Sequence, residues 1–485
     1  MAMLSGSGEE LRRELLDRGV RIDMRNRQLL NDWLMNSYPK VKITAACQTG
    51  WHGMSFVMPD STIGDQTVRY QAEAVGHDSF TTSGTLEGWQ QQVAAPCRDN
   101  PVLMLAVSVA LAGPLLHLAK QQTSGGAAIH LIGDSSQGKT TALQAAASVW
   151  GSPEFVRTWR ATANGLEATA AAQNDTLLVL DEISECDPRE IGSIVYALAN
   201  GVGKQRAGRT GKIRQTQRWR LMGLSSGERS LAAHMAEGGQ RSKAGQEARL
   251  LDVPATQQRF GAFDVLHGCS DGRVFADQMK QMTAAHHGHA GPAFVAALLA
   301  EERELTALYA RIAQLPEFKA AGGQDGRAAN WFALIALAGE LACDCGLVPW
   351  ESGEAIKAAA WGFSTWQAHR GTGPGEDRHI LGGIEEFIER HGDARFSPEK
   401  GHHSTPVRER AGYWRDDQHG RVYLFQKTAL KEAAPGYDQR RILDALESAG
   451  WLVDREKESR SIRITVNGGK PMRVYAVRPA VGASE

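Results

Sequence analysis

Cysteine is scarce in this sequence, which holds six cysteines among 485 residues. They are scattered along the chain, and the single close pair is C-x-C, not the C-x2-C repeat that is typical of zinc sites. A disulfide scaffold is therefore excluded, and the thiols indicate a reduced, cytosolic protein. We expect a cytoplasmic location.

An excess of either charge sign is also missing. Lys and Arg number 54 and Asp and Glu number 55, which gives a net charge of −1. No global positive field draws such a chain to a polyanion. Any contact with nucleic acid must therefore come from a local basic patch.

Long apolar runs are nearly absent, and only residues 101–119 resemble a membrane span. This stretch is almost uncharged and about as long as the roughly 20 residues that cross a bilayer. However, it contains Pro114 and His117, and it directly precedes the strongest soluble-enzyme motif in the chain. A buried helix is therefore favoured over a membrane segment, and we expect no membrane partner.

The length allows about three folded units at roughly 150 residues each, and the composition is that of a globular protein. Helix and strand patterns alternate from about residue 96 to 256, which predicts an α/β fold with a parallel sheet. The order helix, helix and two-stranded hairpin near the C-terminus is typical of a winged helix. The predicted domains are a small N-terminal α+β domain (1–95), a nucleotide-binding core (96–274), a helical lid region (275–372) and a winged-helix domain (373–485).

A glycine-rich loop between an expected strand and an expected helix holds the decisive motif. Residues 133–140 read GDSSQGKT, the Gly-x4-Gly-Lys-Thr pattern of a phosphate-binding loop. Backbone N–H groups of such a loop point at phosphate oxygens, Lys139 reaches the β and γ phosphates, and the Thr140 hydroxyl ligates Mg²⁺. The sequence therefore predicts ATP and Mg²⁺ at this site. The predicted nucleotide-binding residues are Gly133, Asp134, Ser135, Ser136, Gln137, Gly138, Lys139, Thr140 and Thr141.

A second motif follows the loop. The apolar run Leu177–Leu180 is typical of a strand buried on both faces, and it ends in Asp181 and Glu182. Ligands of parallel sheets bind at the carboxyl ends of the strands, so both carboxylates are expected beside the loop. We expect Asp181 to hold Mg²⁺ together with Thr140, and Glu182 to orient and polarise the attacking water.

A third apolar strand, Trp219–Leu224, ends in Ser225 and Ser226. In a P-loop ATPase with an additional strand between the two motifs, a polar residue at this point hydrogen-bonds the γ-phosphate or the water. We assign this role to Ser226. The alternative is a plain cap of the strand end.

Two arginines are candidates for stabilising charge in the transition state. Arg249 stands just before another apolar strand and is placed to act as an arginine finger on a neighbouring subunit, with Arg241 as the second choice. Arg327 opens a long apolar helix and is the candidate arginine of the lid. The alternatives are an arginine in a surface ion pair and a solvated residue at a helix start.

Residues 201–220 form a local basic patch, since they contain seven Lys or Arg and no acidic residue. Gly208 and Gly211 indicate turns, so the segment is predicted to be a hairpin with a basic tip. Such a tip fits contact with the phosphate backbone, with little sequence preference. A solvated charged loop is the alternative. The predicted DNA-binding residues are Lys204, Arg206, Arg209, Lys212 and Arg214.

Four segments together resemble one family. They are W-x-x-T-x-NGLE (Trp159–Glu167), the NDTLLVLDEI strand, LSSGE (Leu224–Glu228) and GQEARLLDVPA (Gly245–Ala255). From about residue 25 onward the chain resembles the Cch-type AAA+ helicases of mobile genetic elements, phages and plasmids, which are similar to MCM-like replicative helicases. The resemblance implies an AAA+ P-loop core, a helical lid and a C-terminal winged helix.

For function, the resemblance implies a ring, expected to be a hexamer, that translocates on single-stranded or forked DNA during replication. The hairpin of residues 201–218 would line its channel. A primase or a replication-initiation protein is a candidate partner, whereas priming by this chain is not expected. The residues carried over from the family's motifs are Lys139, Thr140, Asp181, Glu182, Ser226, Arg249 and Arg327.

Two functions of different classes compete. The first is an ATP-driven DNA helicase or translocase that hydrolyses ATP at the subunit interfaces of a ring. The second is a nucleotide-switched DNA-binding or loading factor, in which ATP controls assembly without processive unwinding. Glu182 and the basic hairpin favour the motor, because a switch needs neither fast hydrolysis nor a tip that grips the backbone.

Overall fold

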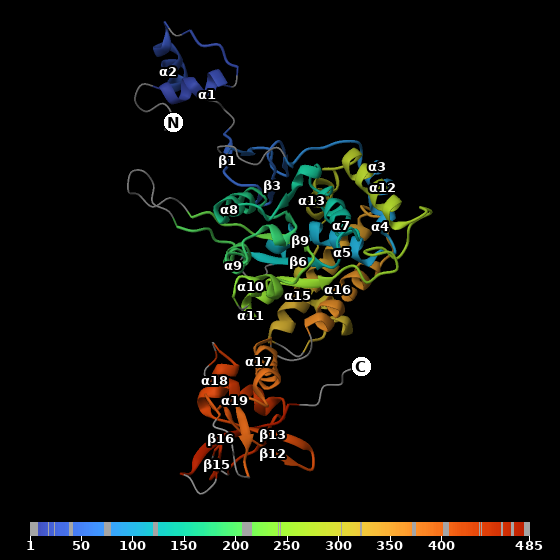
Figure 1. The fold of residues 1–485 in the computed structure, drawn as a ribbon. Coiled ribbons are helices and arrows are strands. Elements are labelled where there is room, and N and C mark those ends of the chain that lie inside the picture. Colours follow the sequence, from blue (N-terminus) through green and yellow to red (C-terminus); the bar gives the residue numbers. More distant parts are fainter. Residues whose placement is uncertain are drawn as a thin grey trace. The chain divides into compact units, whose positions relative to one another are not determined.

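The structure is a computed structural model of the chain, drawn in Figure 1. It describes residues 8–479 except 18, 24, 38–41, 72–78, 120–124, 206–215, 241, 243, 302, 321–322, 371–374, 401–406, 436, 438, 457–458 and 467–469. The chain divides into two compact units, Met1–Glu73 and Ala74–Glu485.

In its described residues, the first unit combines two helices with two small sheets. β1 and β5 pair in parallel, whereas β2, β3 and β4 form an antiparallel sheet. Trp51 and Phe56 lie opposite each other on β2 and β3 with ring centroids 5.1 Å apart, a pairing that stabilises a small sheet. The elements are α1 (Glu9–Asp17), α2 (Arg27–Asn36), β1 (Thr44–Ala46), β2 (Gly50–His52), β3 (Ser55–Val57), β4 (Thr62–Ile63) and β5 (Val68–Tyr70).

The first unit ends at Glu73, earlier than the boundary at residue 95 that the sequence predicted. The segment that follows packs on the second unit. Trp89 is fully buried, and its indole N–H donates to Ser148 Oγ at 2.8 Å, across 59 residues of sequence. The rings of Phe80 and Phe155 meet edge to face, 5.2 Å apart. Local patterning gives no sign of such long-range contacts, so it placed the boundary too late.

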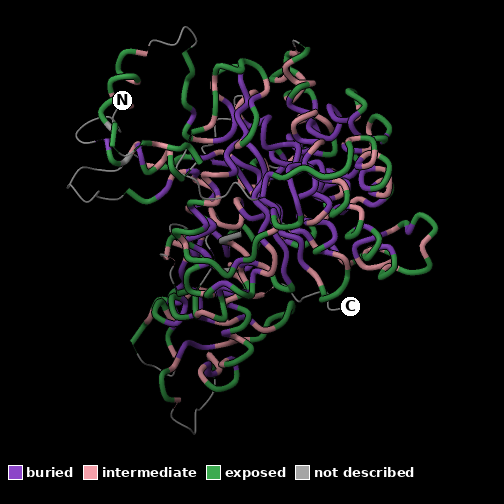
Figure 2. Tube along the Cα trace, turned by 90° about the horizontal axis from the view of Figure 1, so that it is seen from above, coloured by how far each residue is buried: buried purple, intermediate pink, exposed green. Residues whose placement is uncertain are grey.

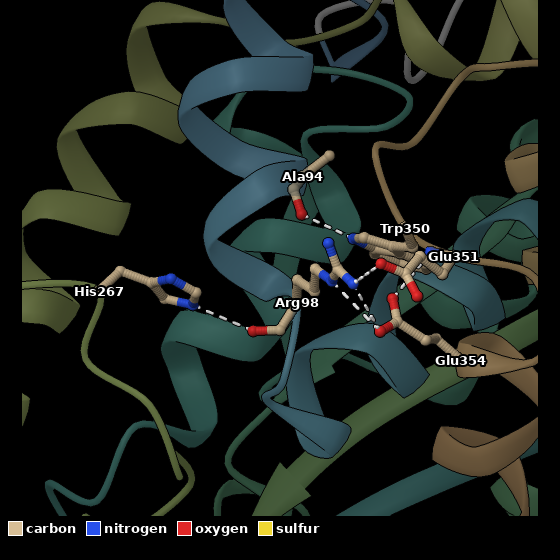
Figure 3. A network of polar contacts seen from close by, with 6 residues as sticks. All are labelled: Ala94, Arg98, His267, Trp350, Glu351 and Glu354. Carbon is tan, nitrogen blue, oxygen red and sulfur yellow. Dashed lines mark hydrogen bonds and ion pairs between the residues drawn. The ribbon is translucent and has the colours of Figure 1, made fainter.

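Figure 3 shows a second attachment of this segment, to the start of α16 (Glu354–Arg370) and the loop before it. The Arg98 guanidinium donates to Glu351 at 2.5 Å and to Glu354 at 3.1 Å. These carboxylates raise the pKa of Arg98. Beside them, the Trp350 indole donates to the Ala94 carbonyl at 2.8 Å. Residues 79–98 therefore belong to the second unit.

The centre of the second unit is a five-stranded parallel sheet in the order β10-β6-β9-β8-β7. β9 pairs with both β6 and β8, which confirms the additional strand that the sequence predicted between the two motifs. It runs from Leu221 to Gly227, so Ser225 and Ser226 lie inside the strand and not after its end. Because all strands are parallel, the loops after β6, β8 and β9 open at one edge of the sheet.

The sheet and its flanking helices have the following bounds: β6 (Gly126–Ile132), α7 (Lys139–Ala147), η4 (Pro153–Phe155), β7 (Val156–Thr158), α8 (Ala163–Ala172), β8 (Leu177–Asp181), η5 (Ile183–Glu185), α9 (Ile191–Asn200), β9 (Leu221–Gly227), α10 (Leu231–Glu237), α11 (Ala244–Glu247) and β10 (Leu250–Pro254). The edge strand β7 is more exposed, whereas the central strands β6, β8 and β9 are mostly apolar and almost entirely buried. This pattern is expected of parallel strands that are covered on both faces.

α5 (Pro101–Ala112) is a buried helix that contacts α7, α15 and α16. All of its residues from the second onward are buried, and buried residues, purple in Figure 2, gather inside the unit. Gly339 permits the close approach of the helices, because a Cβ there would lie 2.6 Å from Ser108 Oγ and 2.5 Å from the Ala355 Cβ. The buried-helix prediction is confirmed. In the described part of the chain, no helix combines the length and apolar character that a membrane span requires.

Helices follow the sheet up to Arg370. α15 and α16 pack against each other as well as against α5, and they belong to the same compact unit as the sheet. Their bounds are α12 (Gly272–Ala285), α13 (Ala290–Ala300), α14 (Leu305–Ala313), η6 (Pro316–Phe318), α15 (Gly323–Asp344) and α16 (Glu354–Arg370). The shorter helices before the sheet are α3 (Leu86–Trp89), the π-helix η3 (Gln90–Ala94), α4 (Ala95–Cys97) and α6 (Leu115–Leu118).

The C-terminal region has its own apolar clusters, formed by the sheet and the helices that its described residues contain. β15 and β16 pair in antiparallel fashion, with Arg463 opposite Arg473, so the hairpin that the sequence predicted after two helices is present. The elements are α17 (Gly375–His391), β11 (Phe396–Pro398), β12 (Gly412–Asp417), β13 (Gly420–Phe425), α18 (Lys427–Ala433), α19 (Gln439–Ser448), β14 (Leu452–Asp454), β15 (Ile462–Ile464) and β16 (Met472–Val477).

Candidate nucleotide site

The loop of residues 133–138 joins β6 to α7 and has the backbone conformation that its glycines allow. Gly133 and Gly138 have φ values of +151° and +93°. A Cβ at Gly133 would lie 2.1 Å from Thr256 Oγ1, and one at Gly138 would lie 2.5 Å from the Phe263 ring. Glycine is therefore required at both positions, for conformation and for space.

Lys139 is the first residue of α7, and its side chain turns back over the loop. The ammonium donates to the carbonyls of Gly133 at 2.7 Å and of Asp134 at 2.6 Å. The side chain is largely buried, and burial lowers its pKa, while the nearby carboxylates, first of all Glu182 and Glu228, act in the opposite direction. The positive charge of Lys139 is only partly balanced by these carboxylates, and it lies in a loop whose backbone N–H groups are donors. Such a site is suited to an anionic ligand.

Asp181, at the end of β8, lies beside the loop as predicted. Its Oδ2 accepts the Thr140 hydroxyl at 3.2 Å. Its Oδ1 accepts the Ser226 hydroxyl and the backbone N–H of Glu182, the latter at 3.1 Å. A hydroxyl and a carboxylate oxygen are the hard donors that Mg²⁺ prefers, and Mg²⁺ commonly takes only one or two protein ligands besides phosphate and water. Thr140 and Asp181 therefore fit the predicted metal.

Glu182 is held in an unusual backbone conformation, with φ at +57°. Its carboxylate accepts from Ser184, at 3.3 Å from the backbone N–H and 2.5 Å from the hydroxyl. Left-handed conformations are uncommon for residues other than glycine, and they cluster at functional sites. The carboxylate is thus held locally beside the loop, within the same pocket.

One pocket of about 240 Å³ unites these groups. Its lining residues are Ser135, Ser136, Gln137, Gly138, Lys139, Thr140, Thr141, Asp181, Glu182, Ser226, Glu228 and Ala276. Glu228 was not predicted from the sequence. It follows the carboxyl end of the additional strand, and the rule that ligands bind at strand ends was the signal that could have found it.

A buried chain of hydrogen bonds lies behind the pocket. The Trp159 indole N–H donates to Ser225 Oγ at 2.8 Å, which leaves the Ser225 hydroxyl to donate to His130 Nδ1 at 2.9 Å. His130 Nε2 in turn donates to the Arg229 carbonyl at 3.0 Å. Burial lowers the pKa of His130 to about 4, so the imidazole is neutral at physiological pH. These hydrogen bonds fix the position of β9, the strand that holds Ser226.

Arg249 lies at the opposite end of the sheet from the pocket. Its neighbour Leu250 pairs with Ala128, near the start of β6, whereas the loop follows the end of β6. The guanidinium donates to the Gly245 carbonyl at 2.6 Å and to Asn200 Oδ1 at 3.1 Å. It also lies over the Tyr196 ring, 4.5 Å from its centroid. Arg249 is therefore anchored to α9 and does not face the pocket of its own chain.

The predicted arginine of the lid is not part of the pocket. Arg327 is an exposed residue near the start of α15 and does not line the pocket. Arg241 lies outside the described residues. The structure therefore does not bring Arg327 to the site within one chain.

The two limbs of the basic segment run antiparallel at their base. The Trp219 N–H donates to the Gly201 carbonyl and the Gly203 N–H to the Gln217 carbonyl, each at 2.9 Å. Lys204 is exposed. Arg220, by contrast, is paired with the buried Asp175 at 2.9 Å. The remaining predicted DNA-binding residues, which are Arg206, Arg209, Lys212 and Arg214, lie outside the described residues.

Comparisons with known proteins bear on the fold. The family model for a domain of unknown function, DUF927, matches residues 1–218. Curated proteins give no match. A solved structure titled "SCCmec type IV Cch - active helicase" is similar, with a TM-score of 0.75 and 17 % sequence identity, over 98 % of this chain and 86 % of that chain. The chain therefore has a Cch-like fold over nearly its whole length.

Proposed function

We propose that this protein is an ATP-hydrolysing DNA helicase that works as a ring. The observation that carries the proposal is the single pocket in which Lys139, Thr140 and Asp181 meet Glu182 and Ser226. Phosphoryl transfer needs a cation on the phosphates, a metal ligand set and a group that orients water, and these residues supply all three. The fold shared with a protein titled an active helicase supports DNA as the partner.

Each residue has a part in ATP hydrolysis in this proposal. The Lys139 ammonium exchanges the two loop carbonyls for oxygens of the β and γ phosphates. Mg²⁺, when held by Thr140 and Asp181, neutralises charge on the phosphates. The Glu182 carboxylate leaves Ser184 and orients the water that attacks the γ-phosphorus, while the bond from that phosphorus to the β–γ bridging oxygen breaks and ADP leaves. The Ser226 hydroxyl, a donor to Asp181, fixes the direction of that carboxylate.

Arg249 acts in this proposal on the neighbouring subunit of the ring. Within its own chain it is separated from the loop by most of the length of β6, roughly 15 Å at about 3.3 Å per residue. This separation excludes a direct role in its own pocket and is compatible with a role in trans. The family resemblance gives six subunits as the expected ring size.

The test is strand displacement on forked DNA with ATP and Mg²⁺, run beside gel filtration of the same preparation. We expect displacement by an oligomer of the native chain and none by Lys139→Ala, which lacks the main positive charge of the loop. DNA-stimulated hydrolysis without displacement would instead support the nucleotide-switched loading factor. Absence of ATP binding would contradict both functions.

A further inference from the structure

One buried carboxylate attaches the base of the basic hairpin to α8. Glu167, on α8, is only 3 % exposed, and its Oε2 accepts the backbone N–H of Lys204 at 3.2 Å. Gly203 passes closely beside it, because a Cβ at that position would lie 3.3 Å from Oε2. A buried carboxylate is stable only when it is hydrogen-bonded, so this contact fixes where the first limb of the hairpin leaves the domain.

The attachment at Lys204 also holds the second limb. The limbs are joined by the two backbone hydrogen bonds of Gly201 with Trp219 and of Gly203 with Gln217. Trp219 is almost fully buried, and its indole N–H donates to the Leu198 carbonyl at 2.8 Å, at the end of α9. A displacement of the first limb is therefore transmitted to the second.

The segment from Trp159 to Glu167 is also attached to the candidate nucleotide site, at its N-terminal end. The backbone N–H of Trp159 donates to the Asp181 carbonyl at 3.2 Å, and its indole donates to Ser225 at 2.8 Å. Thr162 then caps α8, since its hydroxyl accepts the Gly165 N–H at 3.2 Å. The segment that begins at Trp159 is thus bound to β8 and β9, the two strands whose residues line the pocket.

We propose that Glu167 is a positioning residue that couples the nucleotide site to the DNA-binding hairpin. A shift of β8 and β9 on nucleotide binding moves the start of α8, and the helix transmits this shift to the Lys204 amide through the Glu167 carboxylate. Glu167 is the fifth residue of this 10-residue helix, so only its first turn, about 6 Å of stiff helix, lies between the two places. The inference rests on the proposed function, because it takes nucleotide at one end and DNA at the other.

The test uses the full chain with Mg²⁺ and a non-hydrolysable ATP analogue, and it measures amide hydrogen exchange at residues 201–204 and 217–219. Two variants lack the acceptor, Glu167→Met at similar volume and Glu167→Ala, and whichever folds by thermal melting serves. Glu167→Gln keeps an oxygen that accepts the Lys204 N–H. Thr169→Ala is the matched control on the same helix, since that hydroxyl donates to the Gly165 carbonyl of its own helix.

In the native chain the analogue is expected to slow exchange at the hairpin base. In the acceptor-free variants this response disappears, and exchange in the analogue-bound state is roughly tenfold faster, the scale of one lost hydrogen bond to a charged group. Glu167→Gln retains most of the response, and Thr169→Ala behaves as the native chain. An unchanged response in an acceptor-free variant would overturn the proposal.

Activity gives a second readout that separates the coupling from the proposed function. Without the acceptor, basal ATP hydrolysis and the KM for ATP stay within about twofold of the native values, because the pocket is intact, whereas stimulation by DNA falls roughly tenfold. Binding of the analogue is measured independently by fluorescence. A native chain that fails to bind the analogue refutes the proposed function, and one that binds it without any response at the hairpin refutes the coupling alone.

Discussion

Asp252 provides a quantitative prediction about stability. It is a half-buried residue of β10 whose carboxyl group is shielded from water, and among the described residues no cation pairs with it. Both carboxylate oxygens accept the Leu231 N–H, at 3.4 Å and 3.3 Å. Burial raises its pKa from 3.8 to about 7, Glu247 raises it further, and the Leu231 hydrogen bond opposes the shift. The other titratable groups that line the adjoining cavity are Glu247, His369, Arg370 and Arg378.

The sign follows from the raised pKa. Below pH 3.8 the group is protonated in both the folded and the unfolded chain, and it contributes nothing. Between about pH 3.8 and pH 7 the folded chain holds a proton that the unfolded chain has lost, so stability falls as the pH rises through this range, and the full cost is present above about pH 7. About 3 pKa units at 1.36 kcal/mol each give an upper bound of ~4 kcal/mol.

Asp252→Asn removes this cost. The carboxylate borders a cavity of about 160 Å³ that admits water, which weakens the penalty. We therefore expect the variant to gain about 2 kcal/mol of stability at pH 8, roughly half of the upper bound. At pH 5 the gain shrinks to less than half of this value. Thermal melts of the native chain and the variant at both pH values measure it, with Asp277→Asn, an exposed residue of α12, as the control. A gain that is absent at pH 8, or that is equal at both pH values, would refute the reasoning.

The remaining predictions concern the site and the hairpin. Lys139→Ala is expected to abolish ATP binding, whereas Glu182→Gln binds ATP and stalls; hydrolysis by Glu182→Gln at the native rate, measured by phosphate release, would remove Glu182 from its assigned role. Arg249→Ala and Glu182→Gln subunits, each inactive alone, should regain part of the ATPase activity when mixed, because some interfaces then combine an intact pocket with an intact Arg249 from the neighbouring subunit. Inactivity of mixed rings that are shown to exchange subunits would mean that Arg249 is only structural. Neutralising three cations of the basic hairpin should lower DNA affinity and flatten its dependence on salt by about 0.7 to 0.9 in log–log slope per lost phosphate contact, with basal hydrolysis retained. An unchanged slope would instead support the interpretation of this segment as a solvated loop. These cations are Arg206, Arg209 and Lys212.

The parts of the site that could be predicted are those in which a short run of sequence specifies both the chemistry and the backbone. The GDSSQGKT loop needs its glycines at fixed spacing, and an apolar strand ending in two acids places carboxylates at the edge of a parallel sheet. The sequence therefore predicted Lys139, Thr140, Asp181 and Glu182 together, and the structure brings them into one pocket. Ser226 followed from the same rule about strand ends.

The parts that could not be predicted depend on long-range contacts. Glu167 is one acidic residue of a helix, and only the fold shows that it meets the Lys204 amide. Arg220 belongs to the basic run in sequence, yet Asp175, 45 residues earlier, uses it in an ion pair. Arg249 was expected at an interface, and its contacts with Asn200 and Tyr196 were not visible from its position before a strand.

The position of α5 has a consequence for how this chain can be divided. The helix is covered on one side by α7, which begins at the nucleotide loop, and on another by α15 and α16, which follow the sheet by some seventy residues or more. Both sets of neighbours are needed to keep its apolar surface from water. A fragment that stops at residue 274 would expose the helix and is expected to aggregate. The sheet and the helices after it thus form one folded unit. In the proposed function, a conformational change driven by ATP therefore acts through contacts at the margin of this unit, such as the hairpin base.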